Sequence, residues 1–213
     1  MELLESFGPK IAKYKLSKEQ TKSLYDICKP NDSPANETLI GFLHEEYNIV
    51  ESIVTSPFYP DIHQNMETYL KDVDCGFFDN AVMQLENCLQ LDNAWYNKQA
   101  PLEYNPPHNH YPVADLVCVI FPKIDLDDNA EHYTNYKQEK QLGQLHFKYG
   151  ESGVNGFGTS TVSVQPEEGD MYVFPSTMVH YTSPIQGNSI RYSISCNYTF
   201  TNLAKRALSK YKS

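Results

Sequence analysis

The sequence predicts a mainly β fold, a sandwich or barrel, with helical support from the first part of the chain. From about residue 89 onward, short apolar or alternating runs are separated by Pro, Gly, Asn and Asp, as in strands joined by turns. Several short strands at this spacing are typical of sandwiches and barrels. The 213 residues, 40% of them hydrophobic, contain no repeat and no Gly/Pro-rich linker, so we expect one domain.

Two helices are expected in the first part of the chain. Ser17 and Gln20 have the spacing of a capping box ahead of a short apolar run, and residues 61–73 have the pattern of a second helix. A terminal tail or helix follows the last strand. The expected division of the single domain, 1–213, is helical support, barrel strands and terminal segment: residues 1–88, 89–200 and 201–213.

The predicted strands are short and follow one another to residue 200: 115–121, 143–149, 160–164, 170–174 and 189–200. The last of them alternates strictly, so its side chains divide between two faces. One face is apolar: Ile190, Tyr192, Ile194, Cys196, Tyr198 and Phe200. The other is polar: Arg191, Ser193, Ser195, Asn197 and Thr199. The polar face is either solvated or lines a cavity while the apolar face packs on the helices; the motifs described below favour the cavity.

Charge and composition exclude several classes of protein. A formal net charge of −10 opposes the phosphate backbone, so a nucleic acid is not the expected partner. The basic C-terminal residues Lys205, Arg206, Lys210 and Lys212 read as a solvated helix face rather than a basic groove. No apolar stretch approaches the length of a membrane span.

The expected setting is a reducing, intracellular one, the cytoplasm. Charged residues interrupt the first sixteen positions, which therefore lack the apolar core of a signal peptide. The five cysteines, Cys28, Cys75, Cys88, Cys118 and Cys196, make an odd count without a close pair, which argues against a disulfide framework and a zinc knuckle.

A candidate metal site is carried by three histidines. His108 and His110 are two residues apart, so in an extended chain both imidazoles project to one face. His180 follows a turn, a strand and a stop, and would complete a facial set of ligands with open positions. Imidazole ligands suit iron, zinc, copper and nickel alike.

Arg191 follows His180 by eleven residues. If their two strands are antiparallel neighbours, the guanidinium lies deeper in the same cavity as the metal. A buried guanidinium needs an anion, and its planar fork is suited to a carboxylate, to which Ser193 could donate a further hydrogen bond.

Together, His108-x-His110, Gly169-Asp170-Met171-Tyr172-Val173-Phe174-Pro175, His180 and Arg191-Tyr192-Ser193-Ile194-Ser195-Cys196-Asn197 resemble the 2-oxoglutarate/Fe(II) oxygenase superfamily. More narrowly, the chain looks like a group of oxygenases found in bacteria and their viruses. The likeness spans roughly residues 95–200. It implies a double-stranded β-helix, a jelly-roll or cupin-like barrel flanked by the N-terminal helices.

The resemblance also implies a chemistry. Fe(II) would be held by His108, His110 and His180, and 2-oxoglutarate would chelate the iron and be anchored by Arg191 and Ser193. With O2 as the other co-substrate, such enzymes release succinate and carbon dioxide and hydroxylate a C–H bond of the substrate.

One departure from the superfamily concerns the second ligand, which is usually Asp or Glu and here is His110. A neutral imidazole in place of a carboxylate raises the net charge of the iron site by one unit. Asp115 is the nearest carboxylate downstream, but its offset from His108 places it on the opposite face of a regular strand. We therefore prefer His110, with Asp115 open as the ligand after a β-bulge.

Further residues are candidates for contacts around the site. Asn197, Asn97 and His146 are candidates for substrate or supporting contacts, and Tyr104 is a candidate for the co-substrate carboxylate; each can instead be a packing residue. We expect Trp95 in the core. His44, His63 and His132 are expected at the surface.

The long acidic loop 123–142 is expected to be a lid over the active site. It carries Asp125, Asp127, Asp128 and Glu131 but lacks the glycine and distal glutamate of a calcium loop, so we discount calcium.

Three functions compete. The first is an Fe(II)- and 2-oxoglutarate-dependent dioxygenase acting on an unidentified substrate. The second is a cupin-type metalloprotein whose three histidines bind metal without 2-oxoglutarate. The third is a non-catalytic module in a larger assembly, with the altered triad as its support. A homo-oligomer is compatible with each.

Overall fold

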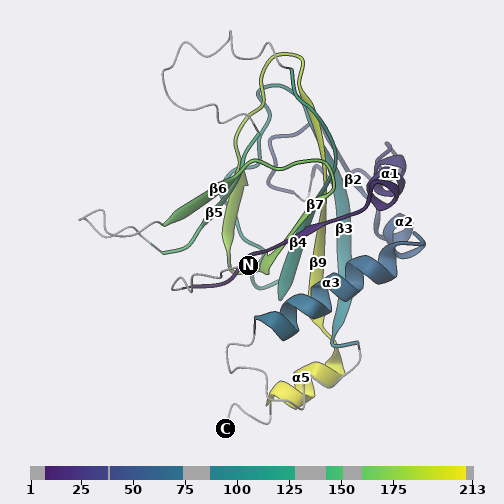
Figure 1. Cartoon of the computed structure of the whole chain (residues 1–213), viewed down its shortest axis with the longest axis vertical. Helices are drawn as coiled ribbons and strands as arrows, with labels where there is room; N and C mark the ends of the chain where they lie inside the picture. Colours follow the sequence, from purple (N-terminus) through teal and green to yellow (C-terminus); the bar gives the residue numbers. More distant parts are fainter. Residues whose placement is uncertain (1–7, 38, 74–86, 128–142, 151–159, 210–213) are drawn as a thin grey trace.

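The computed structural model describes residues 8–37, 39–73, 87–127, 143–150 and 160–209. The predicted mainly β fold is confirmed: the described strands form two antiparallel sheets that face each other (Figure 1). The larger has the order β1 (Ala12–Lys15), β7 (Asp170–Pro175), β4 (Leu116–Asp125), β9 (Ile190–Phe200), β3 (Leu89–Gln99) and β2 (Glu45–Asn48). The smaller has the order β6 (Thr161–Val164), β5 (Leu145–Lys148) and β8 (Val179–Thr182).

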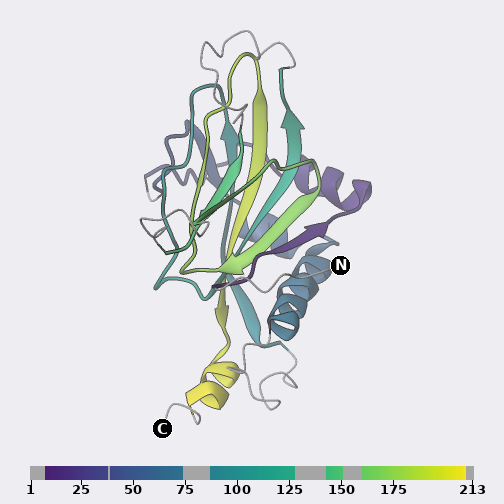
Figure 2. The ribbon, with the colours of Figure 1, turned by 60° about the vertical axis from the view of Figure 1, so that its left-hand side comes forward.

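Helices cover the outer face of the larger sheet. They are α1 (Lys18–Asp26), α2 (Val50–Val54) and α3 (Tyr59–Asp72), while α5 (Asn202–Ser209) follows β9 at the end of the molecule near the C-terminus (Figures 1 and 2). The predicted capping box is present: the Gln20 N–H donates to Ser17 Oγ (3.2 Å), and the Ser17 N–H donates to Gln20 Oε1 (2.8 Å). The predicted second helix corresponds to α3, with Pro60 in its first turn, where the missing N–H costs no hydrogen bond.

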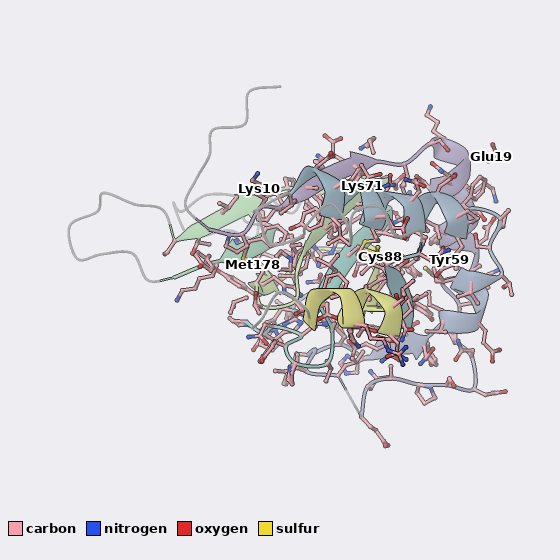
Figure 3. All side chains as sticks on the ribbon, turned by 90° about the horizontal axis from the view of Figure 1, so that it is seen from below. Lys10, Glu19, Tyr59, Lys71, Cys88 and Met178 are labelled. Carbon is pink, nitrogen blue, oxygen red and sulfur yellow. The ribbon has the colours of Figure 1, made fainter. Side chains whose placement is uncertain are left out.

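The large sheet separates two apolar cores. Outside it, the helices pack on the predicted apolar face of β9, where Ile194, Cys196 and Tyr198 are fully buried. Between the sheets, Phe121, Phe147 and Phe174 form a second core. Figure 3 shows the two sides, with Tyr59 of α3 on one and Met178, which belongs to the inner core, on the other. The inner core fills part of the barrel and leaves the rest to a cavity.

The structure corrects the expected elements of the first 88 residues. This segment adds two strands as well as helices, because β1 pairs with β7 and β2 pairs with β3 at the two edges of the large sheet. The predicted runs also omitted β3, which pairs with β9 along its whole length apart from a bulge between Leu91 and Asn93. The predicted strand 115–121 continues to Asp125 as β4, so the first three residues of the expected lid belong to the sheet.

The four described cysteines, Cys28, Cys88, Cys118 and Cys196, are buried thiols, and Cys75 lies outside the described residues. Within the part of the chain that the structure describes, no helix is both long enough and apolar enough to cross a membrane.

Candidate metal centre

Three histidines from two segments of the chain meet inside the barrel. One ring nitrogen from each of His108, His110 and His180 lies within 4.8 Å of the others, as the sequence predicted. The main chain fixes their approach. The His108 N–H donates to the His180 carbonyl (3.1 Å), the His180 N–H donates back (2.9 Å), and the His110 N–H donates to the Ser176 carbonyl (2.9 Å). The segment that carries His108 and His110 thus docks on β8, the strand that carries His180.

Each imidazole is oriented by a contact at Nδ1. The acceptors are the Pro106 carbonyl for His108 (2.7 Å), the Met178 carbonyl for His180 (3.1 Å) and Asn197 Oδ1 for His110 (2.7 Å). An oxygen acceptor at Nδ1 places the proton there and leaves the lone pair on Nε2. The Nε2 atom of His110 is buried and has no hydrogen-bond partner in the described structure. Three such nitrogens converging on one point fit a divalent metal ion.

Burial keeps the three histidines neutral. Loss of solvent lowers the pKa of His108 and lowers that of His110 to about 4, with the nearby His108 contributing to the latter. The pKa of His180 lies well below its ordinary value for the same reasons. A neutral imidazole is the form that binds metal, so protons compete weakly for these ligands near neutral pH.

A cavity of about 430 Å³ adjoins the three histidines. Its floor is the predicted polar face of β9, where Ser193, Ser195 and Asn197 are buried and line the space. The sequence left open whether this face is solvated or lines a cavity, and in the structure it lines the cavity. The cavity is wide enough for small molecules beside a metal ion.

Arg191 lies on the same face of β9, beyond Ser193, and is 2% exposed. Its guanidinium donates to the Gly143 carbonyl and to Gln99 Oε1 and lies 5.2 Å from the centre of the Phe121 ring. Burial lowers its pKa to about 9. Among the described residues no carboxylate forms an ion pair with it, so within this part of the chain the buried positive charge has no counter-charge.

The strands of His180 and Arg191 are not neighbours, so the condition under which the sequence placed Arg191 deeper in the cavity is not met. β8 belongs to the small sheet and β9 to the large one, so the two residues approach from facing sheets rather than along one ladder. Arg191 itself does not line the cavity as it stands, whereas Ser193 does. The carboxylate of a ligand would meet Ser193 first and would compete with Gln99 and Gly143 for the guanidinium.

Asn97 and Trp95 both line the cavity from β3. The Asn97 amide nitrogen donates to Ser193 Oγ (3.4 Å). The Trp95 ring stacks on that of His110, with 5.8 Å between centres, so the expectation of a core tryptophan was wrong. An indole at this position limits how far the imidazole can rotate.

Tyr104 and His146 lie apart from the metal cavity. Tyr104 is 37% exposed and stacks on Phe42, with 5.9 Å between ring centres. His146 is on the opposite face of β5 from Phe147, the cross-strand partner of His180; its Nδ1 contacts Ser163 Oγ (2.7 Å), and its ring stacks on Tyr181. Both residues line a shallower outer pocket. The expected contacts with the co-substrate or substrate therefore do not follow from their placement.

The carboxylate of Asp115 is used in a hydrogen bond within the large sheet. Its Oδ2 accepts from the Phe200 N–H (2.8 Å), and the cluster of potential ligands in the described residues contains only the three histidines. The geometry thus favours His110 over Asp115.

The remaining histidines are not at ligand positions in the described structure. His44 is exposed as expected, although its Nδ1 contacts the buried Glu103. His63 is partly buried between Tyr59 and Tyr198, contrary to the surface expectation. His132 and most of the expected lid, residues 128–142, lie outside the described residues.

Two polar groups of the site were missed from the sequence. Gln99 holds Arg191, and Glu46 lines the cavity from β2. Both lie on strands that the pattern of the first 99 residues did not reveal. The alternation of Asn97 and Gln99 on β3 was the available signal.

Fold and site together define a β-barrel protein with three histidines placed to hold a metal ion. The family described as "Putative 2OG-Fe(II) oxygenase" matches residues 93–197, which contain all three histidines and both Arg191 and Ser193. The chain is a member of the 2-oxoglutarate/Fe(II) oxygenase superfamily, an oxidoreductase of the 2-oxoglutarate-dependent dioxygenase type with iron and 2-oxoglutarate as its cofactors. A comparison with curated protein sequences gives no match.

Solved structures share the double-stranded β-helix. A prolyl-4-hydroxylase from Pseudomonas putida matches with a TM-score of 0.56 and 17% identity over 90% of this chain and 93% of that one. A viral collagen prolyl hydroxylase from Paramecium bursaria Chlorella virus-1, in complex with 2-oxoglutarate, has a TM-score of 0.53 and 11% identity over 88% and 94%. HygX from Streptomyces hygroscopicus, with nickel and 2-oxoglutarate bound, has a TM-score of 0.51 and 10% identity over 90% and 83%. At these identities the likeness shows the fold.

Proposed function

We propose that the protein hydroxylates a C–H bond of a substrate in the cavity and converts 2-oxoglutarate to succinate and carbon dioxide. In this proposal His108, His110 and His180 hold Fe(II), and Arg191 and Ser193 anchor the distal carboxylate of 2-oxoglutarate. The observation that carries it is the set of three imidazoles, those of His110 and His180 buried and that of His108 half-buried, each oriented through Nδ1 toward a shared point. A packed core does not require three such contacts.

The iron would supply activation of oxygen and a template on which co-substrate and substrate are oriented. The chain's own residues prepare the site for it. Asn197 and two backbone carbonyls fix the tautomers of the ligands, and Trp95 restrains the ring of His110. Facial coordination by three protein ligands leaves positions open for the co-substrate and for oxygen.

The anchoring role of Arg191 is supported by its burial without a carboxylate among the described residues. A dianionic co-substrate would bring the missing negative charge, and the planar guanidinium can donate two hydrogen bonds to one carboxylate. Ser193 lies between Arg191 and Asn197 along β9, on the same face of the strand, and lines the cavity.

The test measures 2-oxoglutarate binding and turnover separately. Under anaerobic conditions, calorimetry of the Fe(II)-loaded protein should show 2-oxoglutarate binding that Arg191→Met weakens by at least tenfold, because a charged hydrogen-bonded contact is worth about 1.5–3 kcal/mol. Arg206→Met removes an exposed arginine of α5 and is the matched control. In air, the parent protein should produce succinate, measured by NMR, and His180→Ala should not. Equal binding by Arg191→Met and Arg206→Met would contradict the assigned anchor.

A further inference from the structure

The cavity contains a carboxyl group that neither the metal centre nor the co-substrate anchor uses. Glu46 of β2 is 1% exposed and lines the cavity, and its Oε2 has no hydrogen-bond partner in the described structure. Its neighbour Glu45 points to the other face of the strand, where it pairs with Lys98. Burying a carboxyl group without a partner is costly, so a residue placed in this way is expected to meet a ligand.

Asn97 provides a second acceptor at the same place. It is the direct cross-strand neighbour of Glu46 and is 3% exposed, and its Oδ1 is buried without a partner in the described structure. Its amide nitrogen is used by Ser193, which leaves the oxygen for the cavity. Two buried acceptors side by side call for a ligand that brings hydrogen-bond donors.

The segment opposite Glu46 leaves room for its carboxyl group. A Cβ atom on Gly41 would lie 2.6 Å from Glu46 Oε1 and 2.5 Å from Asn105 Oδ1, closer than such contacts allow. Gly41 therefore passes directly beside both side chains, and Asn105 adds its amide oxygen to the same region. Glu46, Asn97 and Asn105 thus bring side-chain oxygens from three segments of the chain to the lining of one cavity.

Glu46 and the proposed co-substrate anchor belong to one row of cross-strand neighbours, which runs across three strands of the large sheet. Glu46 on β2 pairs with Asn97 on β3, which in turn pairs with Ser193 on β9. A co-substrate dianion would lie at the β9 end, near Arg191, because the carboxylate of Glu46 would repel it. The β2 end is then left to the substrate.

The metal centre is within reach of the same region. Trp95, which stacks on His110, is two residues from Asn97, so the Cα atoms of Glu46 and Trp95 are separated by about 8 Å at ordinary strand spacings. A small molecule or one side chain can span that distance. A group held at Glu46 would place a neighbouring C–H bond near the metal.

We infer that Glu46 and Asn97 form a substrate subsite that binds a cationic nitrogen, an ammonium or a guanidinium group. A hydroxyl would satisfy the two acceptors but would leave the charge of the carboxylate without compensation, whereas a cation supplies both donors and charge. The net charge of −10 also favours the approach of a cation. The inference rests on the proposed function for the reaction that follows, but binding at Glu46 needs neither the metal nor 2-oxoglutarate.

The mouth of the cavity suits the apolar part of such a substrate. Ile40 and Val113 line it while remaining 56% and 69% exposed. Exposed apolar side chains at the rim of a polar pocket can cover an aliphatic stem. A substrate with a cationic end and an alkyl stem fits both features.

The experiment compares a cation with its neutral isostere on the protein without added metal or 2-oxoglutarate. Ligand-observed NMR titrations at pH 8 would give the Kd of n-butylammonium and of n-butanol for the parent, Glu46→Gln, Glu46→Asp and Glu45→Gln. The parent should prefer the cation by about tenfold or more, the scale of a charge-assisted hydrogen bond. The preference should disappear in Glu46→Gln, persist at reduced size in Glu46→Asp, and be unchanged in Glu45→Gln.

A parent without the preference, or a preference that survives in a folded Glu46→Gln variant, would overturn the inference. Blocked amino acids distinguish two sources of the same chemistry. Binding of Nα-acetyl-lysine methylamide or its arginine counterpart indicates a peptide side chain, and binding of the free amine alone indicates a small metabolite. Failure of 2-oxoglutarate binding would refute the proposed function while leaving this result intact, because the two titrations share no ligand.

Discussion

Replacement of Asn197 by leucine is expected to weaken metal binding without removing a ligand. Asn197 is 5% exposed, and its Oδ1 accepts from the Nδ1–H of His110 at 2.7 Å. In Asn197→Leu, a side chain of similar size leaves that N–H buried without an acceptor. The unsatisfied group costs about 1–3 kcal/mol, and the imidazole is free to change its tautomer and protonate Nε2 instead. We therefore expect the metal affinity to fall by about 10–100-fold, the range found for partners of metal-ligating histidines.

The measurement is a competition titration of Co(II) or Zn(II) against a chromophoric chelator at pH 7.5. Asn93 is the matched control, since it lies directly across from Asn197 on β3 and is an exposed amide. Asn93→Leu should bind metal like the parent, and Asn197→Asp should bind more tightly because a carboxylate raises the basicity of the imidazole. The reasoning would be refuted by an Asn197→Leu variant that retains the parent's affinity, or by an equal loss in Asn93→Leu.

Three further predictions concern charge and stability. Burial, and to a smaller extent the negative charge of Glu103, raises the pKa of Glu46 from 4.5 to about 7. Between these two pH values the folded protein keeps a proton that the unfolded chain releases. The free energy of unfolding therefore falls as the pH rises from 4.5 to 7. Glu46→Gln should therefore be more stable than the parent at pH 8, by on the order of 3 kcal/mol, and similarly stable at pH 4. Urea unfolding at both pH values measures the difference, and equal stability of the two proteins at pH 8 would contradict the prediction. Arg191→Lys should weaken 2-oxoglutarate binding by about tenfold, because an ammonium cannot form the two parallel hydrogen bonds of a guanidinium; calorimetry that shows an unchanged Kd would exclude a bidentate contact. Ser17→Ala should lower the free energy of unfolding by about 1 kcal/mol through loss of the cap of α1, whereas Lys18→Ala in the same turn should change it little; thermal unfolding measures both, and equal effects would argue against the cap.

Local sequence patterns were sufficient for the part of the site that depends on strand geometry. The alternation over residues 190–200 placed Ser193 and Asn197 on the cavity face and Ile194 against the helices, because a strand leaves only two directions for a side chain. The spacing of His108 and His110 similarly indicated a shared direction, and both rings lie against that of His180.

Long-range pairing could not be predicted from those patterns. The edge strands β1 and β2 have only four residues each, too few for a periodic signal, and their pairing with β7 and β3 is decided by the rest of the fold. Glu46 was missed because its role depends on that pairing.

Tyr104 and His146 were wrongly expected at the metal cavity for the same reason. Tyr104 is only four residues before His108 in the chain, yet its ring stacks on that of Phe42, away from the metal cavity. His146 is on a strand of the barrel, but the register with β8 assigns the cavity side to its neighbour Phe147. Whether a residue on a predicted strand faces inward depends on a register that the sequence of that strand alone does not contain.

The central claim is that the three histidines and Arg191 form one site for Fe(II) and 2-oxoglutarate. The most direct test is the visible absorption of the anaerobic Fe(II) protein titrated with 2-oxoglutarate, where chelation of the keto acid gives a weak charge-transfer band. We predict a band in the parent that is absent in His110→Ala and, at the same 2-oxoglutarate concentration, in Arg191→Ala. Fe(II) binding without a band in the parent would contradict the claim.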